Sequence, residues 1–322
     1  MRKLYKKKFW IITALCVSIL FVGAAALFFD KKTKLEESEK IIPIAMAADN
    51  NYTYPTIVSF TSLMMNAKNN THYDVHIMIP GDFSEENKQK LLSLQEKFNN
   101  RCKINLIDMQ DRYKNAYDKG HITTPTYYRL SLSSLLPDLN KLIWLDGDTL
   151  IFEDLEQMLN IDMDNFYYKG FLDNNVDGLE EFGIKDDHYI CAGVLLVNLE
   201  KLRQDDVEPK FEKFISENND RLQQHDQTVI NAVCYKNIGV LPAKYGVFNF
   251  SNEKTAKDYA NILKATNKYT EKEMEKAFKQ PAILHYVSKP WGEYEVNRKA
   301  LWWEYAAKTD YFDEIKAHYG VA

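Results

Sequence analysis

An uninterrupted apolar run, Leu142–Leu145, lies near the middle of the chain and ends directly at two carboxylates. A strand without polar positions is typical of a sheet that is covered on both faces. Other short apolar runs alternate with segments of helical apolar spacing, at 41–48, 75–79, 103–109, 170–173, 189–198 and 281–287. Strands that alternate with helices predict a doubly wound α/β domain, with the run at 142–145 in its central strand.

The two carboxylates, Asp146 and Asp148, flank Gly147. Residues i and i+2 of an extended chain point the same way, so the two acids can converge just past the strand end. The glycine lets the backbone approach whatever they hold. Two ionised carboxylates this close repel each other unless a cation lies beside them. The pattern indicates a divalent-cation site, and a solvated Asp-Gly turn is the alternative that this stretch alone leaves open.

The N-terminal residues predict membrane attachment. Residues 1–8 form a basic tail that precedes an uncharged segment, 9–29, long enough for a helix of roughly 30 Å. Because the basic flank comes first, we expect a single-pass signal-anchor with a cytoplasmic N-terminus; a cleaved signal peptide is the alternative. Charged residues 30–40 would form a stalk. The rest of the chain would then lie in a Golgi-type lumen in a eukaryote, or at the inner or plasma membrane in a bacterium.

The chain beyond residue 40 is acidic. The formal net charge is −5, and residues 1–40 hold nine basic and four acidic side chains, so the remainder carries about −10. An acidic surface argues against nucleic-acid binding, and a phosphate-bearing ligand would need a cation or a few placed basic groups. Cys102, Cys191 and Cys234 show no paired spacing, so the sequence indicates neither a zinc site nor a disulfide framework.

Several segments hold single polar residues that a ligand site could use. The segment 123–137 is predicted to be a helix carrying one arginine, Arg129. Another helix opens at His225-Asp226-Gln227, where Asp226 is expected to be the N-cap. His285 lies at a strand end, where a single histidine is usually structural. The strand at 189–198 begins with small residues, as if a bulky ligand lay against it.

Two further helical segments complete the pattern. Ser84 is expected to cap a helix whose buried face holds Leu91, Leu92, Leu94 and Phe98. Residues 291–322 are rich in aromatic side chains. They are expected to form a C-terminal helix that packs on the domain or lies on a membrane surface.

The polar candidates belong to six motifs in one order between Ile41 and Trp291. The motifs are Ala47-Ala48-Asp49-Asn50-Asn51-Tyr52, Thr126-Tyr127-Tyr128-Arg129-Leu130, Leu145-Asp146-Gly147-Asp148, Ala192-Gly193-Val194-Leu195-Leu196-Val197-Asn198, Asp226-Gln227, and His285-Tyr286 with Lys289-Pro290-Trp291. In this order the chain resembles the retaining glycosyltransferases of family 8, which include glycogenin and bacterial lipopolysaccharide galactosyl- and glucosyltransferases.

The resemblance implies a GT-A fold, a Rossmann-like mixed sheet flanked by helices, over residues 41–290. It also implies transfer of a hexose, glucose or galactose, from a UDP-sugar to a glycan or glycolipid acceptor with retention at the anomeric carbon. By the same resemblance the donor would be bound by Ala47, Asp49, Asn51, Tyr52, Arg129, Asp146, Gly147 and Lys289, with Tyr52 stacking on the base. Asp146, Asp148 and His285 would bind manganese, and Asp173, Asp226 and Gln227 would lie around the transferred sugar.

The residue types of the implied site suit a divalent cation that binds a diphosphate. Two carboxylates, an imidazole and diphosphate oxygens form a six-coordinate donor set, and the imidazole suits Mn²⁺ better than Mg²⁺, which could act as a substitute. The cation would neutralise charge on the departing UDP. Retention needs either a covalent glycosyl-enzyme or same-face attack guided by the leaving phosphate. The sequence does not choose between them; we favour same-face attack, with Asp226 and Gln227 orienting the sugar.

Two positions depart from the family pattern. Cys191 stands where members usually have asparagine before the Ala-Gly pair, which removes a hydrogen-bonding amide. Only three residues separate His285 from Lys289, where the family loop is typically longer and contains glycine. A catalytically impaired UDP-sugar-binding protein is therefore an alternative. A phosphatase of the haloacid dehalogenase class is a remote one, because Thr149 follows Asp146 by three residues rather than four.

Overall fold

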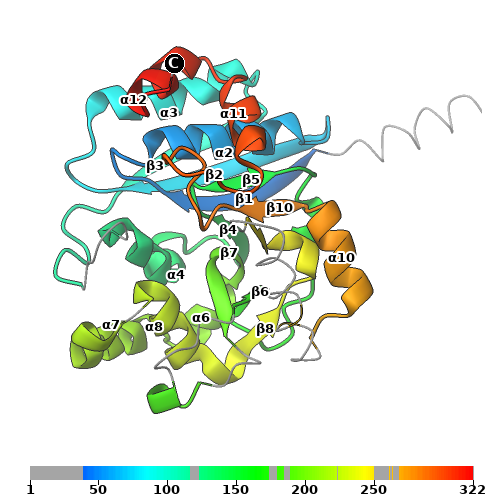
Figure 1. Ribbon diagram of the computed structural model, residues 1–322. Helices are drawn as coiled ribbons and strands as arrows, with labels where there is room; N and C mark the ends of the chain where they lie inside the picture. Colours follow the sequence, from blue (N-terminus) through cyan, green and yellow to red (C-terminus); the bar gives the residue numbers. More distant parts are fainter. Residues whose placement is uncertain are drawn as a thin grey trace, which may run out of the picture. The chain divides into compact units, whose positions relative to one another are not determined.

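A mixed sheet organises the part of the chain that the computed structural model describes, residues 39–116, 123–173, 180–184, 189–222, 224–249, 261, 263 and 268–321. Seven strands lie in the order β3-β2-β1-β4-β7-β6-β8 (Figure 1). They are β1 Lys40–Ala47, β2 Thr71–Ile79, β3 Cys102–Asp108, β4 Lys141–Leu145, β6 Tyr168–Leu172, β7 Ile190–Asn198 and β8 Ile238–Val240.

The direction of the strands changes at β7. β1 runs parallel to β4, whereas β7 is antiparallel to both of its neighbours, β4 and β6. The sheet is therefore mixed, as the resemblance to GT-A enzymes predicted. The apolar run Leu142–Leu145 lies in β4, in the middle of the sheet, and each of its residues has 0% exposure. The predicted central strand, covered on both faces, is confirmed.

A second, three-stranded sheet begins where the paired aspartates end. Its strands lie in the order β5-β10-β9 and are β5 Thr149–Ile151, β9 Val247–Phe248 and β10 Ile283–His285. β10 pairs antiparallel with β5, and His285 lies opposite Thr149. The stretch 146–148 is thus the connection between two sheets. This pairing brings a histidine near the C-terminus of the domain beside the carboxylates in its middle.

Helices cover both faces of the large sheet (Figure 1). On one side lie α2 Thr53–Met65, α3 Glu85–Lys97, α11 Lys299–Ala306 and α12 Phe312–His318. On the other lie α4 Leu132–Leu135, α6 Leu199–Gln204, α7 Glu208–Asn218 and α8 His225–Cys234. α10 Glu271–Lys279 lies at the periphery, and the short helix α5 Glu156–Leu159 follows β5. Short 3₁₀ helices are η1 Thr124–Ser131, η2 Glu180–Phe182, η4 Asn219–Arg221, η5 Tyr235–Asn237 and η6 Ala243–Tyr245.

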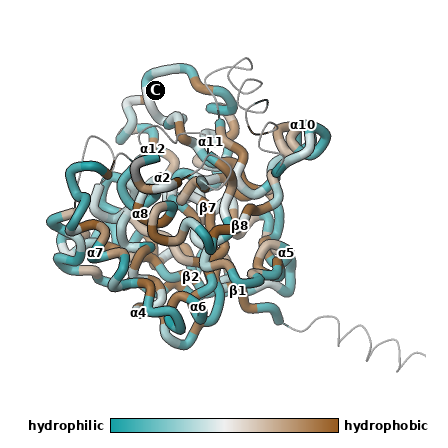
Figure 2. The backbone as a smooth tube through the Cα atoms, turned by 90° about the horizontal axis from the view of Figure 1, so that it is seen from below, coloured by the Kyte–Doolittle hydropathy of each residue, from teal (hydrophilic) through white to brown (hydrophobic). Residues whose placement is uncertain are grey.

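The apolar residues gather in two large buried clusters. One packs α2 and α3 against β1 and β2, and the other fills the opposite face of the sheet, around η1, β7 and α8. In Figure 2 the strands are coloured mainly as hydrophobic, whereas hydrophilic colour predominates on outer turns such as those of α7. The core thus packs both faces of the large sheet and leaves the strand ends to form a site.

The predicted cap of α3 is confirmed, since Ser84 Oγ accepts a hydrogen bond from the Asn87 backbone N at 3.2 Å. Leu91 and Leu94 are buried, as expected. The prediction for Leu92 is wrong, because this side chain is 37% exposed. Successive helical residues are turned by about 100°, so Leu92 cannot share the face of Leu91.

The segment 123–137 was expected to be one helix, and this is wrong. It forms the 3₁₀ helix η1 followed by the single turn α4. Five successive residues of η1, 127–131, are all buried. Packing around the whole segment, and not one apolar stripe, therefore sets its conformation.

Residues 291–322 form two helices, α11 and α12, rather than one. They pack on the domain, with Trp302 and Ile315 at 0% exposure. Glu314 on α12 pairs with Lys90 of α3 at 2.8 Å. Every helix among the described residues is too short or too polar to cross a bilayer. The predicted signal-anchor, residues 9–29, lies outside the described residues and stays a prediction.

Candidate active site

A cavity of about 640 Å³ opens where β1, β4 and β10 end. Every site residue expected from the sequence lines it except Asn51, which is exposed at the turn before α2. Those in its wall are Ala47, Asp49, Tyr52, Arg129, Asp146, Gly147, Asp148, Asp173, Asp226, Gln227, His285 and Lys289. The fold therefore collects residues that lie up to about 240 positions apart in the sequence.

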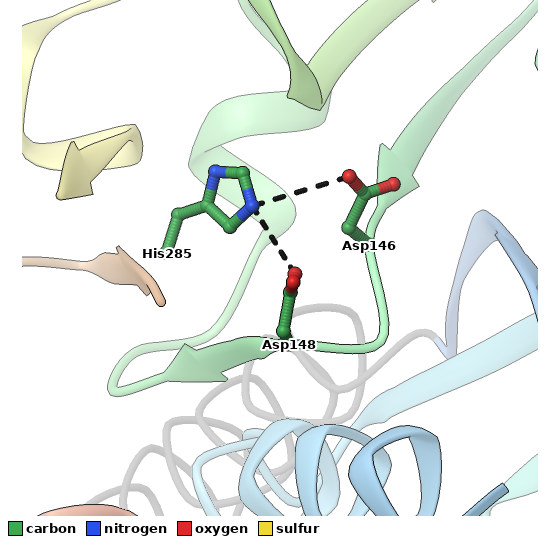
Figure 3. Close-up of side chains that lie close together, drawn as sticks. All are labelled: Asp146, Asp148 and His285. Atoms are coloured by element: carbon green, nitrogen blue, oxygen red, sulfur yellow. Dashed lines mark ion pairs between the residues drawn. The ribbon is translucent and has the colours of Figure 1, made fainter. Parts of the chain in front are cut away.

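Asp146, Asp148 and His285 converge at one end of this cavity (Figure 3). His285 Nε2 lies 3.1 Å from Asp148 Oδ1 and 4.0 Å from Asp146 Oδ2. One ligand atom from each residue lies within 4.8 Å of the others. Asp148 is only 3% exposed, so the alternative of a solvated turn is wrong for this carboxylate.

Backbone hydrogen bonds hold the three side chains in place. The Asp146 N donates to Gly193 O of β7 at 2.8 Å, and the Tyr286 N donates to Asp148 O at 2.9 Å. Gly147 was expected to allow close approach to a ligand. A Cβ there would lie 2.5 Å from Thr56 Oγ1 of α2, so this glycine allows the close approach of α2.

The charges at this cluster offset one another. Burial by itself would raise the pKa of Asp148, but Lys289 and His285 lower it below its ordinary value. Burial disfavours a charged imidazole, yet Asp148 raises the pKa of His285 to about 10. The Lys289 ammonium contacts Asp148 Oδ2 directly, despite the short loop between His285 and Lys289.

The donor set fits a divalent cation. Two carboxylates from the 146–148 connection and an imidazole from β10 face one point, and the close partner of Asp148 Oδ1 is His285 Nε2 at 3.1 Å, the third candidate ligand itself. Carboxylate oxygens suit hard divalent ions such as Mn²⁺ and Mg²⁺, and an imidazole ligand favours a transition-metal ion. Asp146, Asp148 and His285 are thus the residues that could hold a metal.

Arg129 connects this cluster to the other end of the cavity. Its Nη2 lies 2.9 Å from Asp146 Oδ1, and its Nε lies 2.9 Å from Asp226 Oδ2. The guanidinium also donates to Ala192 O and lies 4.5 Å from the centre of the Trp144 ring. Arg129 is only 3% exposed. It faces the cavity as expected, but the partly exposed Asp146 and the buried Asp226 already use its charge.

Asp226 is not the N-cap of α8, as was expected, because that position is Gln224. Asp226 lies within the first turn and is 4% exposed. Burial raises the pKa of Asp226 to about 6, although Arg129 acts in the opposite direction. The carboxylate is therefore held where a ligand could reach it from inside the cavity.

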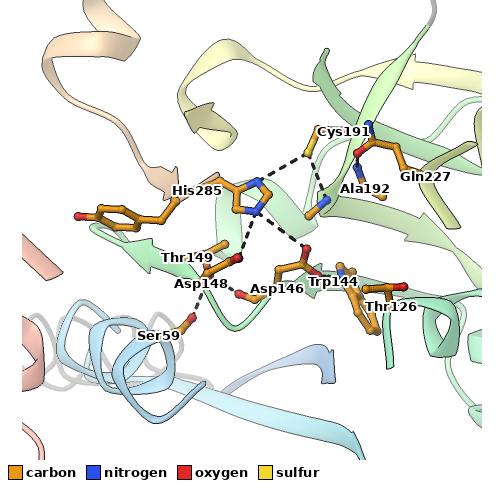
Figure 4. Close-up of polar contacts among 12 residues, drawn as sticks. Ser59, Thr126, Trp144, Asp146, Asp148, Thr149, Cys191, Ala192, Gln227 and His285 are labelled. Carbon is orange, nitrogen blue, oxygen red and sulfur yellow. Dashed lines mark hydrogen bonds and ion pairs between the residues drawn. The ribbon is translucent and has the colours of Figure 1, made fainter. Parts of the chain in front are cut away.

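Gln227 joins strand β7 to Asp173. Its Oε1 accepts from the Ala192 N at 2.9 Å (Figure 4). Its Nε2 donates to Asp173 Oδ2 at 3.0 Å and to Tyr189 Oη at 3.2 Å. Asp226, Gln227 and Asp173 all line the cavity, and their expected place around a transferred sugar stays a prediction. Tyr189 was not singled out from the sequence.

Asp49 and Tyr52 form a further part of the cavity wall. Asp49 Oδ1 accepts from the Tyr52 N at 2.8 Å, and its Oδ2 accepts from Thr123 Oγ1 at 2.9 Å. The Tyr52 ring meets Trp291 edge-on at 6.0 Å between ring centres. An aromatic face with a fixed orientation is therefore available at this wall.

Sequence reasoning missed Trp144 and Phe248 as residues of the site. Trp144 Nε1 donates to Asp146 Oδ1 at 2.8 Å, and Phe248 meets the His285 ring edge-on at 5.7 Å. Trp144 belongs to an apolar strand, which predicts a core residue, and its polar nitrogen beside Asp146 was the one available signal. No signal pointed to Phe248.

Comparisons with known proteins agree with this geometry. The sequence profile of glycosyl transferase family 8 matches residues 43–295. General stress protein A of Bacillus subtilis is 26% identical over 261 residues, which cover 79% of this chain and 88% of that protein.

Two solved structures share the fold. The bifunctional glycosyltransferase WbbM matches with a TM-score of 0.70 and 20% identity, over 87% of this chain and 52% of WbbM. The galactosyltransferase LgtC, in complex with donor and acceptor sugar analogues, matches with a TM-score of 0.66 and 21% identity, over 87% of this chain and 95% of LgtC. At these identities the structures show a common GT-A-like fold.

Proposed function

The chain belongs to glycosyl transferase family 8, and from this premise we propose that it is a metal-dependent, retaining hexosyltransferase. Its donor would be a UDP-sugar, with glucose or galactose as the hexose, and its acceptor a glycan or glycolipid. One observation carries the proposal: the Asp146, Asp148 and His285 cluster shares a cavity with the Arg129 and Asp226 pair. Membership in a transferase family argues against the phosphatase alternative.

The nucleotide would bind between Asp49 and Tyr52. Tyr52 offers an aromatic face for the base, and Trp291 fixes its orientation. Asp49 would accept hydrogen bonds from the uridine, and Ala47 leaves room at the end of β1. Asn51 is the weakest part of this assignment, because it is exposed and does not line the cavity.

The diphosphate would bind at Asp146, Asp148 and His285 through Mn²⁺, with Mg²⁺ as a substitute. When bound, the cation would stabilise the negative charge on departing UDP. Lys289, whose ammonium already lies at Asp148, would add positive charge at the same end. Because the domain is acidic overall, the cation and Lys289 would supply the electrostatic attraction for the UDP-sugar.

The hexose would bind against Asp226, Gln227 and Asp173. Asp226 is paired with Arg129 at 2.9 Å. The neutral amide of Gln227 is hydrogen-bonded through both its oxygen and its nitrogen. A paired carboxylate and an amide are weak nucleophiles and good hydrogen-bonding groups. This supports same-face attack, in which these residues orient the sugar and form no covalent bond to it.

The test is UDP release from a panel of UDP-hexoses, with Mn²⁺ and without an acceptor. We expect release from UDP-glucose or UDP-galactose that stops when EDTA removes the metal, and none from a GDP-hexose control. No release above the metal-free control, with any UDP-hexose, would show that the chain is not this enzyme. UDP-sugar binding without release would instead favour the alternative of an impaired binding protein.

A further inference from the structure

The imidazole of His285 lies in a narrow space on strand β7. A Cβ added to Gly193 would fall 2.2 Å from His285 Cε1, 2.7 Å from Nδ1 and 2.8 Å from Nε2. All three distances are too short for any side chain. The edge of the Phe248 ring packs against the imidazole, with 72° between the ring planes. The small residues that open β7 therefore accommodate a protein side chain at this point.

Cys191 fixes the rotation of the ring within that space (Figure 4). Its Sγ lies 3.6 Å from His285 Nδ1, and among the described residues it is the hydrogen-bonding partner of that nitrogen. Cys191 and His285 are each 6% exposed, so water has little access to this contact. With Nδ1 at the sulfur, the opposite nitrogen, Nε2, points at Asp148 and Asp146.

Gly193 also fixes one of the carboxylates. Its carbonyl accepts from the Asp146 N at 2.8 Å, and its own N donates to Cys191 Sγ at 3.4 Å. The glycine thus sets both the backbone of Asp146 and the face of His285. A shift of this part of β7 would move two of the three candidate metal ligands.

We propose that Cys191 and Gly193 are positioning residues that aim His285 Nε2 at the cation site. The inference rests on the proposed function, since it needs a cation there. A histidine that binds metal through Nε2 carries its ring hydrogen on Nδ1 and usually donates it to a carboxylate, carbonyl or water. In this chain a cysteine sulfur accepts it, at the position where the family pattern has asparagine.

The test measures the Mn²⁺ dissociation constant in the presence of UDP, by electron paramagnetic resonance, for variants of both residues. Cys191→Ala removes the acceptor and should weaken Mn²⁺ binding about 10-fold, within the range seen when such partners of metal ligands are lost. Cys191→Ser keeps an acceptor and should restore binding to within about 3-fold. The matched control is Cys102→Ala, a buried cysteine of β3 outside the cavity, which should leave Mn²⁺ binding unchanged.

Gly193→Ala should weaken Mn²⁺ binding about 10- to 100-fold, because the methyl group displaces the ring. In a His285→Ala background, which removes the ring, neither Gly193→Ala nor Cys191→Ala should weaken binding further. If Gly193→Ala does not fold, the Cys191 series carries the same test.

The outcomes separate the positioning role of Cys191 and Gly193 from the proposed metal-dependent function. If the wild type binds Mn²⁺ and His285→Ala weakens binding, but Cys191→Ala does not, the positioning role is wrong and the metal site stands. Effects that persist in the His285→Ala background would also overturn the positioning role. If the wild type binds no Mn²⁺ with UDP, the proposed function fails together with the inference.

Discussion

Asp148→Asn lowers kcat for Mn²⁺-dependent transfer by on the order of 10³-fold, which is the largest effect that we expect of a single substitution on activity. The variant keeps the shape of the side chain and removes the charge of a candidate metal ligand that is 3% exposed. A metal that stabilises a leaving group contributes several kcal/mol to the barrier, and each 1.36 kcal/mol is about a tenfold change in rate.

The measurement is the initial rate of UDP release against Mn²⁺ concentration, with unfolding followed in parallel. Asp164→Asn is the matched control, because that aspartate lies outside the cavity and pairs with Lys169 at 3.0 Å. It should keep activity within about twofold, since surface substitutions of this kind have small effects. Full Mn²⁺-dependent turnover in Asp148→Asn would place the metal site elsewhere.

Arg129→Met is expected to lower the free energy of unfolding by about 3–5 kcal/mol. The guanidinium is 3% exposed and lies 2.9 Å from both Asp146 and Asp226. Methionine fills a similar volume but leaves two carboxylates without their cation. Removing one partner of a buried ion pair is far more costly than removing both. The double variant Arg129→Met/Asp226→Asn should therefore be more stable than Arg129→Met alone.

The loss of unfolding free energy in Arg129→Met should depend on pH. Burial raises the pKa of Asp226 to about 6 in the folded protein, above its ordinary value of 3.8. The folded state therefore binds this proton more readily than the unfolded state, so the group favours folding at low pH and this contribution is lost as pH rises through about 6. Without Arg129 the charged form of Asp226 is even less favourable in the folded protein. Urea unfolding should show a larger loss in Arg129→Met at pH 8 than at pH 5.

Arg112→Met is the control for this experiment, because Arg112 is exposed. It should change stability by no more than about 0.5 kcal/mol. Equal stability of Arg129→Met and wild type would show that the ion pairs do not hold the two ends of the cavity together. A double variant less stable than Arg129→Met would contradict the account of an unpaired carboxylate.

The sheet and most of the candidate site could be predicted because their signals are local. The apolar run at 142–145 is typical of a buried strand, and the Asp-Gly-Asp that follows it indicated either a cation site or a solvated turn. The order of six motifs then indicated His285 as the third ligand, which spacing alone could not. Its approach to Asp148 depends on the pairing of β5 with β10, a contact between segments more than 130 residues apart.

The incorrect predictions concern residues whose role is set by packing around them. Asp226 reads as an N-cap, but it ion-pairs with Arg129 of η1. Leu92 is apolar but faces away from the core. For Asp226 a residue distant in the sequence decides the outcome, and no local pattern encodes that neighbour, whereas the exposure of Leu92 follows from its angle on its own helix.

The central claim is that Asp146, Asp148 and His285 together bind a divalent cation with UDP. The most direct measurement is a crystal structure of the chain grown with Mn²⁺ and UDP, with anomalous diffraction used to locate the manganese. We predict one strong anomalous peak in contact with Asp146, Asp148, His285 Nε2 and the diphosphate. UDP bound in the cavity with no anomalous peak at these three side chains would contradict the account.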